Sequence, residues 1–205
     1  LSQWGVPAGM IGTSVGDDLL GHHVADTLKK MGVQGKVRFT KKYKTPLEVN
    51  VSDKKGARTY FWQRSEEILG TLDTADLSLI KKSKLLYVDW YDGDAHILRA
   101  MEEAHRHNVP VFLNFEHGHQ HPELLKKYSG LVTVCQAVTD AAQIGKKQAM
   151  LGVARKLINS GIKTAIITMA SQGCMVVHGE EVIRVHAPKV KAVDGSGAGA
   201  TFSAG

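Results

Sequence analysis

The amino-acid sequence predicts an α/β protein built on a mostly parallel sheet that helices cover on both faces. From residue 79 onward, short apolar segments alternate with segments of helical periodicity. Residues 37–61 differ from this pattern, because they are rich in β-forming residues and alternate apolar with polar positions. The chain then ends on a glycine-rich turn followed by residues that favour a helix. Strands and helices that alternate in this way are typical of parallel sheets with helical layers.

Composition places the chain among globular proteins of one domain. Its 205 residues are 43% hydrophobic and 22% charged, which is typical of a soluble domain that buries a sizeable core. No apolar run approaches the ~20 residues that span a bilayer, and no signal peptide is visible. We therefore expect a cytoplasmic protein with no membrane partner.

The formal net charge is +6, and an anionic partner is one explanation for it. However, the lysines are spread in pairs along the chain, with no basic stripe interleaved with aromatic residues. Such pairs are typical of a solvated surface. We therefore expect no nucleic-acid partner, whereas a small anion such as a nucleotide polyphosphate fits the charge.

The first predicted elements are a helix and a hairpin. Apolar residues recur at helical spacing over residues 20–31, and Asp17 or Asp18 is the expected N-cap. Residues 37–61 then predict an antiparallel hairpin that turns at residues 53–56.

The second half of the chain predicts repeated βα units. Helices are expected at residues 95–107, 122–128 and 147–159, and strands at 84–88, 109–113, 131–134, 163–169, 174–178 and 182–185. Ligands of such sheets bind beyond the carboxyl ends of the strands. Asp89 and Glu116 leave their strands at this end, so both are candidate site residues. Asp94 is expected to cap the helix that follows it.

Small residues dominate the last turn, where Gly197, Ala198, Gly199 and Ala200 follow one another. Without bulky side chains the backbone N–H groups can approach an anion closely, and a helix N-terminus adds partial positive charge. The turn therefore predicts a phosphate site. Asp194, which precedes it, is either a turn-capping residue or part of that site.

Cysteines and histidines complete the candidate reactive groups. Cys135 and Cys174 are flanked by apolar residues, and we interpret them as small buried hydrophobic side chains. His117, His119 and His121 alternate in a loop and allow a metal site, but exposed loop histidines explain them better.

Four segments, in order along the chain, resemble the motifs of one family. Residues 12–21 match G-x-x-x-G-x-D-x-x-G, and residues 53–59 match D-x-x-G-x-R-T. Residues 166–173 stand where the family has T-L-G-x-x-G, and residues 194–200 read D-G-S-G-A-G-A where the family has D-T-T-G-A-G-D. The chain thus resembles the ribokinase-like (PfkB) carbohydrate kinases over nearly all of its length.

The resemblance implies a three-layer α/β/α ribokinase-like fold, a single domain over residues 1–205, with a small β-strand lid at about residues 37–61. It implies a kinase that transfers the γ-phosphate of ATP to a sugar hydroxyl with Mg²⁺, and with a monovalent cation such as K⁺. It also implies a homodimer formed through the lid. Members of the family have further N- and C-terminal parts, so either the chain is a fragment or disordered ends are missing from it.

The resemblance also assigns roles to residues. The N–H groups of Gly197, Ala198 and Gly199 would stabilise the transferred phosphate, and Asp194 would lie beside the metal–phosphate network or a monovalent cation. The candidates for nucleotide binding are Thr168, Ala170, Gly173, Asp194, Ser196 and Gln136.

Three further residues are candidates for substrate contacts. Arg58 lies in the lid and is either a substrate-facing charge or an exposed hairpin arginine. Asp89 is expected beside the substrate. Glu116 could accept a hydrogen bond from a sugar or help to order magnesium.

Ala200 stands where the family has its catalytic aspartate. A methyl group cannot accept a proton, and the loss of a general base typically costs about 10² to 10⁴ in rate. Two functions therefore stay open: a carbohydrate kinase impaired at Ala200, and a non-catalytic pseudokinase that binds sugar or nucleotide in a regulatory or assembly role. Ketohexose, ribose and 2-keto-3-deoxygluconate stay open as the acceptor, and nucleosides are a less favoured alternative.

Overall fold

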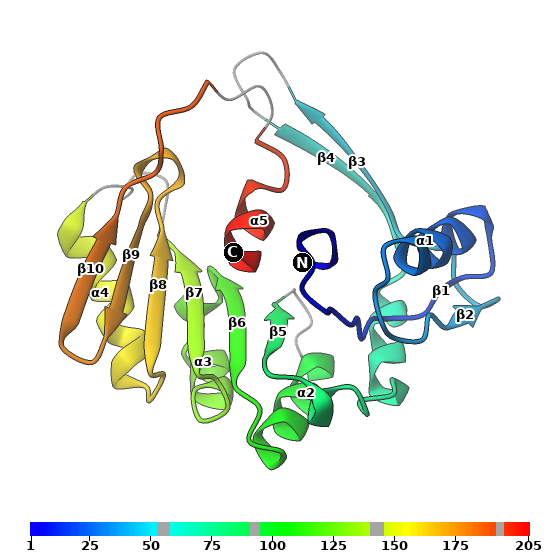
Figure 1. Ribbon diagram of the computed structural model, residues 1–205, viewed down its shortest axis with the longest axis horizontal. Helices are drawn as coiled ribbons and strands as arrows, with labels where there is room; N and C mark the ends of the chain where they lie inside the picture. The colour runs from blue at the N-terminus through cyan, green and yellow to red at the C-terminus, as the bar shows by residue number, and fades with distance from the viewer. Residues whose placement is uncertain (53–57, 91–94, 140–145, 192–194) are drawn as a thin grey trace. The chain divides into compact units, whose positions relative to one another are not determined.

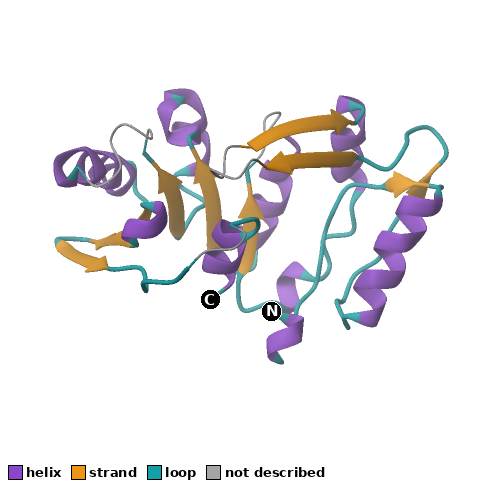
Figure 2. Cartoon of the chain, turned by 90° about the horizontal axis from the view of Figure 1, so that it is seen from above, coloured by secondary structure: helices purple, strands orange, loops and turns teal. Residues whose placement is uncertain are grey.

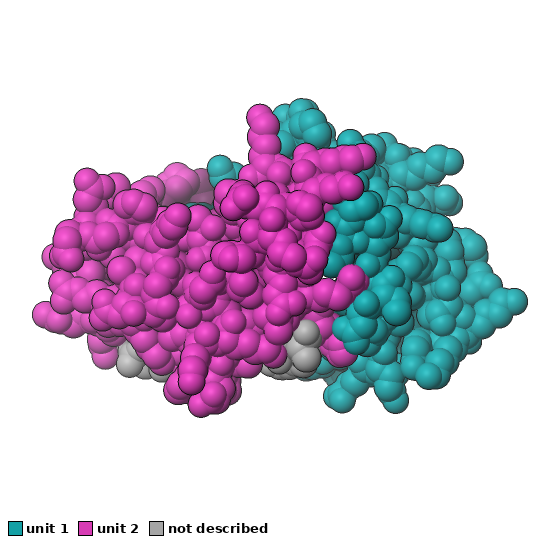
Figure 3. Space-filling model, turned by 90° about the horizontal axis from the view of Figure 1, so that it is seen from below, with its two compact units in different colours: residues 1–79, 192–205 teal, residues 80–191 magenta. Residues whose placement is uncertain are grey.

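The computed structural model describes residues 1–52, 58–90, 95–139, 146–191 and 195–205 (Figure 1). The chain divides into two compact units, which Figure 3 distinguishes by colour. Unit 1 comprises residues 1–79 together with 192–205, and unit 2 comprises residues 80–191. The two units are described separately below.

Unit 2 contains a six-stranded sheet in the order β10-β9-β8-β7-β6-β5. Its first four strands along the chain are mutually parallel, and β9 pairs antiparallel with both β8 and β10, which confirms the mostly parallel sheet. Figure 2 shows the strands in orange. They are β5 (Leu86–Asp89), β6 (Val111–Glu116), β7 (Val134–Val138), β8 (Thr164–Thr168), β9 (Cys174–His178) and β10 (Glu181–Val185).

Helices α2 (Ala95–Arg106), α3 (Pro122–Tyr128) and α4 (Lys147–Asn159) alternate with these strands. Helix α2 contacts β5 and β6, and α4 contacts β8 and β9. Met101 and Ala104 of α2 are fully buried, which is typical of a helix that packs one apolar face against a sheet. Short 3₁₀ turns also occur: η3 (Ile80–Lys82), η4 (Gly118–Gln120) and η6 (Ala170–Gln172).

The described residues of unit 1 form two small sheets and two α-helices. Strand β1 (Val15–Gly16) pairs in parallel with β2 (Phe39–Thr40). Strands β3 (Leu47–Ser52) and β4 (Arg58–Gln63) form an antiparallel hairpin. Helix α1 (Leu19–Lys30) follows β1, and α5 (Ala198–Ala204) follows the glycine-rich turn. Two 3₁₀ segments, η1 (Ser2–Trp4) and η2 (Glu66–Thr74), complete the unit.

The structure corrects the bounds of several predicted elements, the hairpin and β7 among them. The hairpin covers residues 47–63 rather than 37–61, because Phe39 and Thr40 pair with β1 instead; its turn lies outside the described residues. The strand predicted at residues 131–134 is β7, which begins at Val134, where pairing with Phe112 and Thr164 starts. Val132 is buried without strand pairing, so its apolar character did not mark the start of the strand.

In the part of the chain that the structure describes, no helix combines the length and the apolar character needed to cross a bilayer.

Candidate functional site

The motif at residues 12–21 is organised around the carboxylate of Asp18. Asp18 is the N-cap of α1, where its Oδ1 accepts the N–H of Gly21 at 2.9 Å. Its Oδ2 accepts the N–H of Thr45 at 2.9 Å, and its Oδ1 accepts the Thr45 hydroxyl at 2.7 Å. These hydrogen bonds, those from Thr45 first, lower the pKa of Asp18 to about 2. Asp18 therefore ties the start of α1 to residue 45 and acts as a structural connection.

The glycines of the same motif are required by close packing. A Cβ atom on Gly21 would lie 2.0 Å from the carbonyl oxygen of Gly16. A Cβ atom on Gly16 would lie 2.6 Å from the backbone nitrogen of Thr45. Because both contacts involve backbone atoms, neither position has room for a side chain. The motif of unit 1 is thus explained by packing within the unit.

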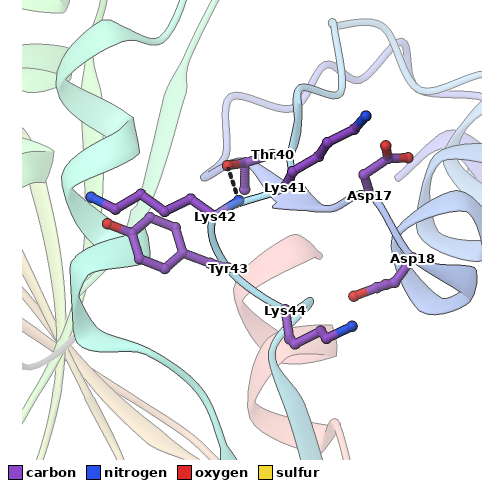
Figure 4. Close-up of a pocket in the computed structure, with 7 residues that line it drawn as sticks. All are labelled: Asp17, Asp18, Thr40, Lys41, Lys42, Tyr43 and Lys44. Carbon is purple, nitrogen blue, oxygen red and sulfur yellow. Dashed lines mark hydrogen bonds between the residues drawn. The ribbon is translucent and has the colours of Figure 1, made fainter.

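A cavity of about 220 Å³ lies beside this motif, and Figure 4 shows its lining. Lys44 extends on the side of Asp18, whereas Lys42 and Tyr43 extend together, away from the aspartates (Figure 4). The Lys42 ammonium lies 5.0 Å from the centroid of the Tyr43 ring, and its hydrogen bond with Tyr43 raises the pKa of Lys42. The sequence interpretation took the lysine pair as solvated surface and did not identify the cavity. The lining residues are Asp17, Asp18, Thr40, Lys41, Lys42, Tyr43 and Lys44.

The β3–β4 hairpin, which corresponds to the predicted lid, exposes apolar side chains. Leu47, Val49, Val51 and Phe61 share one face by the strand register, and each is at least 41% exposed. Arg58 begins β4, where it pairs with Ser52; its side chain lies outside the described part of the structure.

The terminal turn has the local geometry that the sequence predicts. Gly197 adopts φ +73° as the N-cap of α5, and the helix begins at Ala198. The Ala198 N–H donates to the carbonyl of Gly195 at 3.3 Å, whereas Gly199 and Ala200 lie in the first turn, where backbone N–H groups have no partner within the helix. Ser196 precedes this turn, and Asp194 lies outside the described residues.

The carboxyl edge of the unit 2 sheet carries a row of polar side chains. Asp89 of β5 pairs in register with Asn114 of β6, and Asn114 pairs with Gln136 of β7. Asn114 Nδ2 donates to Asp89 Oδ1 at 2.8 Å and to Glu116 Oε1 at 3.0 Å. Gln136 Nε2 donates to Asn114 Oδ1 at 3.2 Å. The structure thus brings together Asp89, Glu116 and Gln136, three of the predicted site residues.

Asn114 joins these groups, and sequence reasoning missed it. The residue lies inside a strand of mostly apolar residues, and that polar interruption was the available signal. Gln136 is only 2% exposed, and its Nε2 donates to Asn114 Oδ1. Its role in nucleotide binding stays a prediction.

The end of β8 and the segment after it hold three more of the predicted nucleotide residues. Thr168 Oγ1 lies 3.5 Å from the carbonyl oxygen of Ala137. Ala170 adopts φ +49°, a left-handed conformation that glycine, the family's residue here, adopts more easily. Gly173 adopts φ +93°, and a Cβ atom there would lie 1.9 Å from the carbonyl oxygen of Val185. The glycine at 173 is thus required by the close approach of the backbone at the end of β10.

The cysteine interpretation is confirmed, and the histidine interpretation is partly wrong. Cys135 and Cys174 are buried free thiols, and burial raises the pKa of Cys135 to about 12. His119 is buried rather than exposed, because η4 places its Nε2 2.8 Å from the carbonyl oxygen of Val138. His117 and His121 are exposed. Among the residues described, no three His, Cys, Asp or Glu side chains are grouped to hold a metal ion.

A mostly parallel sheet with polar groups at its carboxyl edge is typical of α/β proteins whose ligands bind at that edge. The pfkB family carbohydrate kinase model matches residues 1–205, and the chain belongs to that family. The predicted family and the ribokinase-like fold class are thereby confirmed.

Curated relatives carry kinase names. The chain is 24% identical to an ATP-dependent 6-phosphofructokinase of Thermoanaerobacterium thermosaccharolyticum, covering 96% of the chain and 65% of that protein. It is 25% identical to a probable chloroplastic fructokinase-6 of Arabidopsis thaliana, covering all of the chain and 58% of that protein. The chain thus spans less than two thirds of the length of these relatives.

Solved structures share the fold. Adenosine kinase of Sinorhizobium meliloti superposes with a TM-score of 0.77 at 23% identity, covering 100% of this chain and 66% of that one. A ribokinase of Arabidopsis thaliana complexed with ribose and ATP gives a TM-score of 0.75 at 17% identity, covering 99% of this chain and 69% of that one. At these identities the likeness establishes the fold.

Proposed function

We propose that this chain carries the scaffold of an ATP-dependent carbohydrate kinase that transfers the γ-phosphate to a sugar hydroxyl. The observation that carries the proposal is the match of the whole chain, residues 1–205, to the pfkB carbohydrate kinase family. Relatives named as phosphofructokinase and fructokinase support a sugar acceptor. The carboxylates at the edge of the unit 2 sheet are groups that can accept hydrogen bonds from sugar hydroxyls.

Phosphoryl transfer depends on positioning and on stabilising charge at the phosphate. We assign the second task to the backbone N–H groups of the terminal turn, Gly197, Ala198 and Gly199, and note that the Ala198 N–H already contacts Gly195. Asp194 is the proposed residue beside a metal or monovalent cation such as K⁺. Bound Mg²⁺ would neutralise charge on the phosphates of ATP. Asp89, Glu116 and Arg58 are the proposed substrate residues, and Thr168, Ala170, Gly173, Ser196 and Gln136 the proposed nucleotide residues.

Two backbone features after β8 bear on whether a nucleotide can bind there. Ala170 has a left-handed backbone, and the backbone of Val185 lies close to Gly173. Both positions keep the backbone conformation that a glycine-rich turn provides, so the local chain path suits a nucleotide-binding loop. The Ala170 methyl group, however, adds bulk where the family has glycine.

A pseudokinase is a second candidate, and Ala200 is the observation that favours it. The residue lies in the first turn of α5 and presents a methyl group where the family has the catalytic aspartate. Such a protein would bind sugar or nucleotide without transferring phosphate.

The variant Ala200→Asp separates the two candidates. Restoring the carboxylate is expected to raise sugar phosphorylation by about 10² to 10⁴ if the chain is an impaired kinase. The assay measures phosphate transfer from ATP with Mg²⁺ to a panel of ketohexose, ribose and 2-keto-3-deoxygluconate. Ala204→Asp adds the same charge to the same helix and serves as the matched control, with no gain expected. Ligand binding without any transfer by Ala200→Asp would support the pseudokinase.

We also propose a cytoplasmic homodimer formed through the lid hairpin. The free, buried thiols Cys135 and Cys174 are in keeping with a reducing compartment. The apolar face of β3 and β4 offers exposed side chains that a second hairpin could cover.

A further inference from the structure

Three polar side chains form a graded row across the sheet of unit 2. Asp89, Asn114 and Gln136 occupy matching positions on three neighbouring parallel strands, so their side chains share one face of the sheet. Asp89 is exposed, Asn114 is 8% exposed and Gln136 is 2% exposed. The row therefore runs from a buried amide to a carboxylate at the surface.

The hydrogen bonds of the row determine how the Asn114 amide is oriented. Its N–H₂ group has two hydrogens, and these serve Asp89 Oδ1 at 2.8 Å and Glu116 Oε1 at 3.0 Å. Turning the amide over would place its carbonyl oxygen against both carboxylates. The two carboxylates therefore determine the orientation of the Asn114 amide. Gln136 supports the same orientation by donating to Asn114 Oδ1.

A local irregularity brings Glu116 to the same amide. The register of β6 against β7 shifts between Asn114 and Glu116, and Glu116 adopts φ +48°. Irregularities of this kind re-aim a side chain relative to a regular strand. Here the Glu116 carboxylate reaches the Asn114 amide, which already contacts Asp89.

We propose that Asn114 is a positioning residue that holds the Asp89 and Glu116 carboxylates as a paired acceptor for the hydroxyl groups of a sugar. Gln136 supports Asn114 by donating a hydrogen bond to its side-chain carbonyl oxygen. The inference rests on the proposed function, because the substrate is taken to be a polyhydroxylated sugar.

The chemistry of the groups fits this arrangement. An ionised carboxylate has two oxygens and about four acceptor sites. The Asn114 amide binds one oxygen of each carboxylate. It thereby also restrains the second oxygens, Asp89 Oδ2 and Glu116 Oε2, which are the proposed acceptors for the sugar. Holding acceptors in place before binding avoids the entropy of ordering them when the substrate arrives.

Asn114→Asp is the main test, because it keeps the shape of the side chain and removes both hydrogen-bond donors. The dissociation constant of each sugar in the panel is measured by calorimetry on the full chain. Loss of a hydrogen bond to a charged group corresponds to a weakening of about 10- to 100-fold. We expect the affinity of Asn114→Asp for the sugar to fall by this factor. In the Ala200→Asp background, we expect KM for the sugar to rise while KM for ATP stays within about twofold, since positioning and nucleotide contacts are separate.

Thr164→Val is the matched control. Thr164 Oγ1 lies 2.9 Å from His178 Nδ1, across two strands at the amino end of the same sheet. The variant removes a cross-strand side-chain contact far along β8 from its carboxyl end, and sugar affinity should not change.

A spectroscopic measurement keeps the inference testable if Asn114→Asp does not fold. In the unaltered chain, the side-chain N–H₂ signals of Asn114 should exchange with solvent more slowly than those of exposed Asn50, and Gln136→Leu should reduce this protection and weaken sugar binding by about threefold to tenfold. Exchange as fast as that of Asn50, or sugar affinity unaffected by either variant, would overturn the inference alone. A chain that binds no sugar in the panel would contradict the proposed function, and with it the substrate assigned to the pair.

Discussion

In unit 2 apolar side chains pack around a sheet, whereas in unit 1 hydrogen bonds that involve side chains connect short segments. Met101, Leu113 and Phe115 are among the many fully buried side chains of unit 2. Among the residues described in unit 1, only Ile68 and Ala75 are buried hydrophobic residues.

Unit 1 is ordered by polar contacts instead. Arg38 Nη1 donates to Thr74 Oγ1 at 2.9 Å, and Ser14 N–H donates to Thr71 Oγ1 at 2.8 Å. Together with the contacts of Asp18 to Thr45, these bonds fix loops rather than a core. A typical hydrogen bond contributes about 1 kcal/mol, less than the burial of a large apolar side chain. The two units should therefore respond differently to similar substitutions.

The largest effect is expected from truncating a buried ring. Phe115 is fully buried, and its ring packs edge-on against Trp90 and Tyr128. Phe115→Ala should lower the free energy of unfolding by about 3–5 kcal/mol. Phe61→Ala removes the same atoms from a side chain of unit 1 that is 60% exposed. This variant should change the free energy of unfolding by less than about 0.5 kcal/mol. Urea unfolding at low protein concentration measures both, and equal effects would contradict the contrast between the units.

An intermediate effect on stability is expected when each of two helical glycines is replaced by alanine. Gly21→Ala in α1 would place a methyl group 2.0 Å from the Gly16 carbonyl oxygen, and should destabilise the chain by about 1–3 kcal/mol. Gly152→Ala in α4 meets no atom within 4 Å, and should stabilise it by about 0.5–1 kcal/mol. Thermal unfolding of the two variants tests the opposite signs. A stabilising Gly21→Ala would show that the packing of this motif is looser than described.

The smallest effect concerns the pH dependence of unit 1. The pKa of Asp18 is lowered from 3.8 to about 2, so its ionised form stabilises the folded state above pH 3.8, and this contribution is lost as the pH falls toward 2. Asp18→Asn should lack this component, so its stability should approach that of the unaltered chain as the pH falls through this range.

Thr45→Val provides the control for this prediction, because it removes the hydroxyl contact to Asp18 while leaving the carboxylate. It should shift the loss of stability to higher pH. Identical pH profiles for all three chains, measured by urea unfolding, would contradict the role assigned to Asp18.

Sequence patterns predicted unit 2 more completely than unit 1. Helices at residues 122–128 and 147–159 and the strand at 174–178 have the predicted bounds, because periodicity and burial agree there. In unit 1, the pairing of Phe39 and Thr40 with β1 depends on contacts distant in sequence. The segment Glu66–Thr74 was not predicted as a 3₁₀ helix.

The candidate site was predicted in part for a similar reason. Strand ends identified Asp89 and Glu116, because carboxyl ends of parallel strands meet at one edge. Asn114 was missed because its role arises from register with Asp89 and from the shifted position of Glu116. His119 was misplaced because only the turn η4 directs it inward.

The alkylation rate of the two buried thiols can report how often unit 2 opens. Thiolate is the form that reacts with alkylating reagents, and Cys135 has a pKa of about 12 in the folded chain. Both cysteines are buried in strands of unit 2, so we expect alkylation to depend on local opening of that unit. Mass-spectrometric labelling would thus record the opening of unit 2 alone, with no engineered probe and no signal from unit 1.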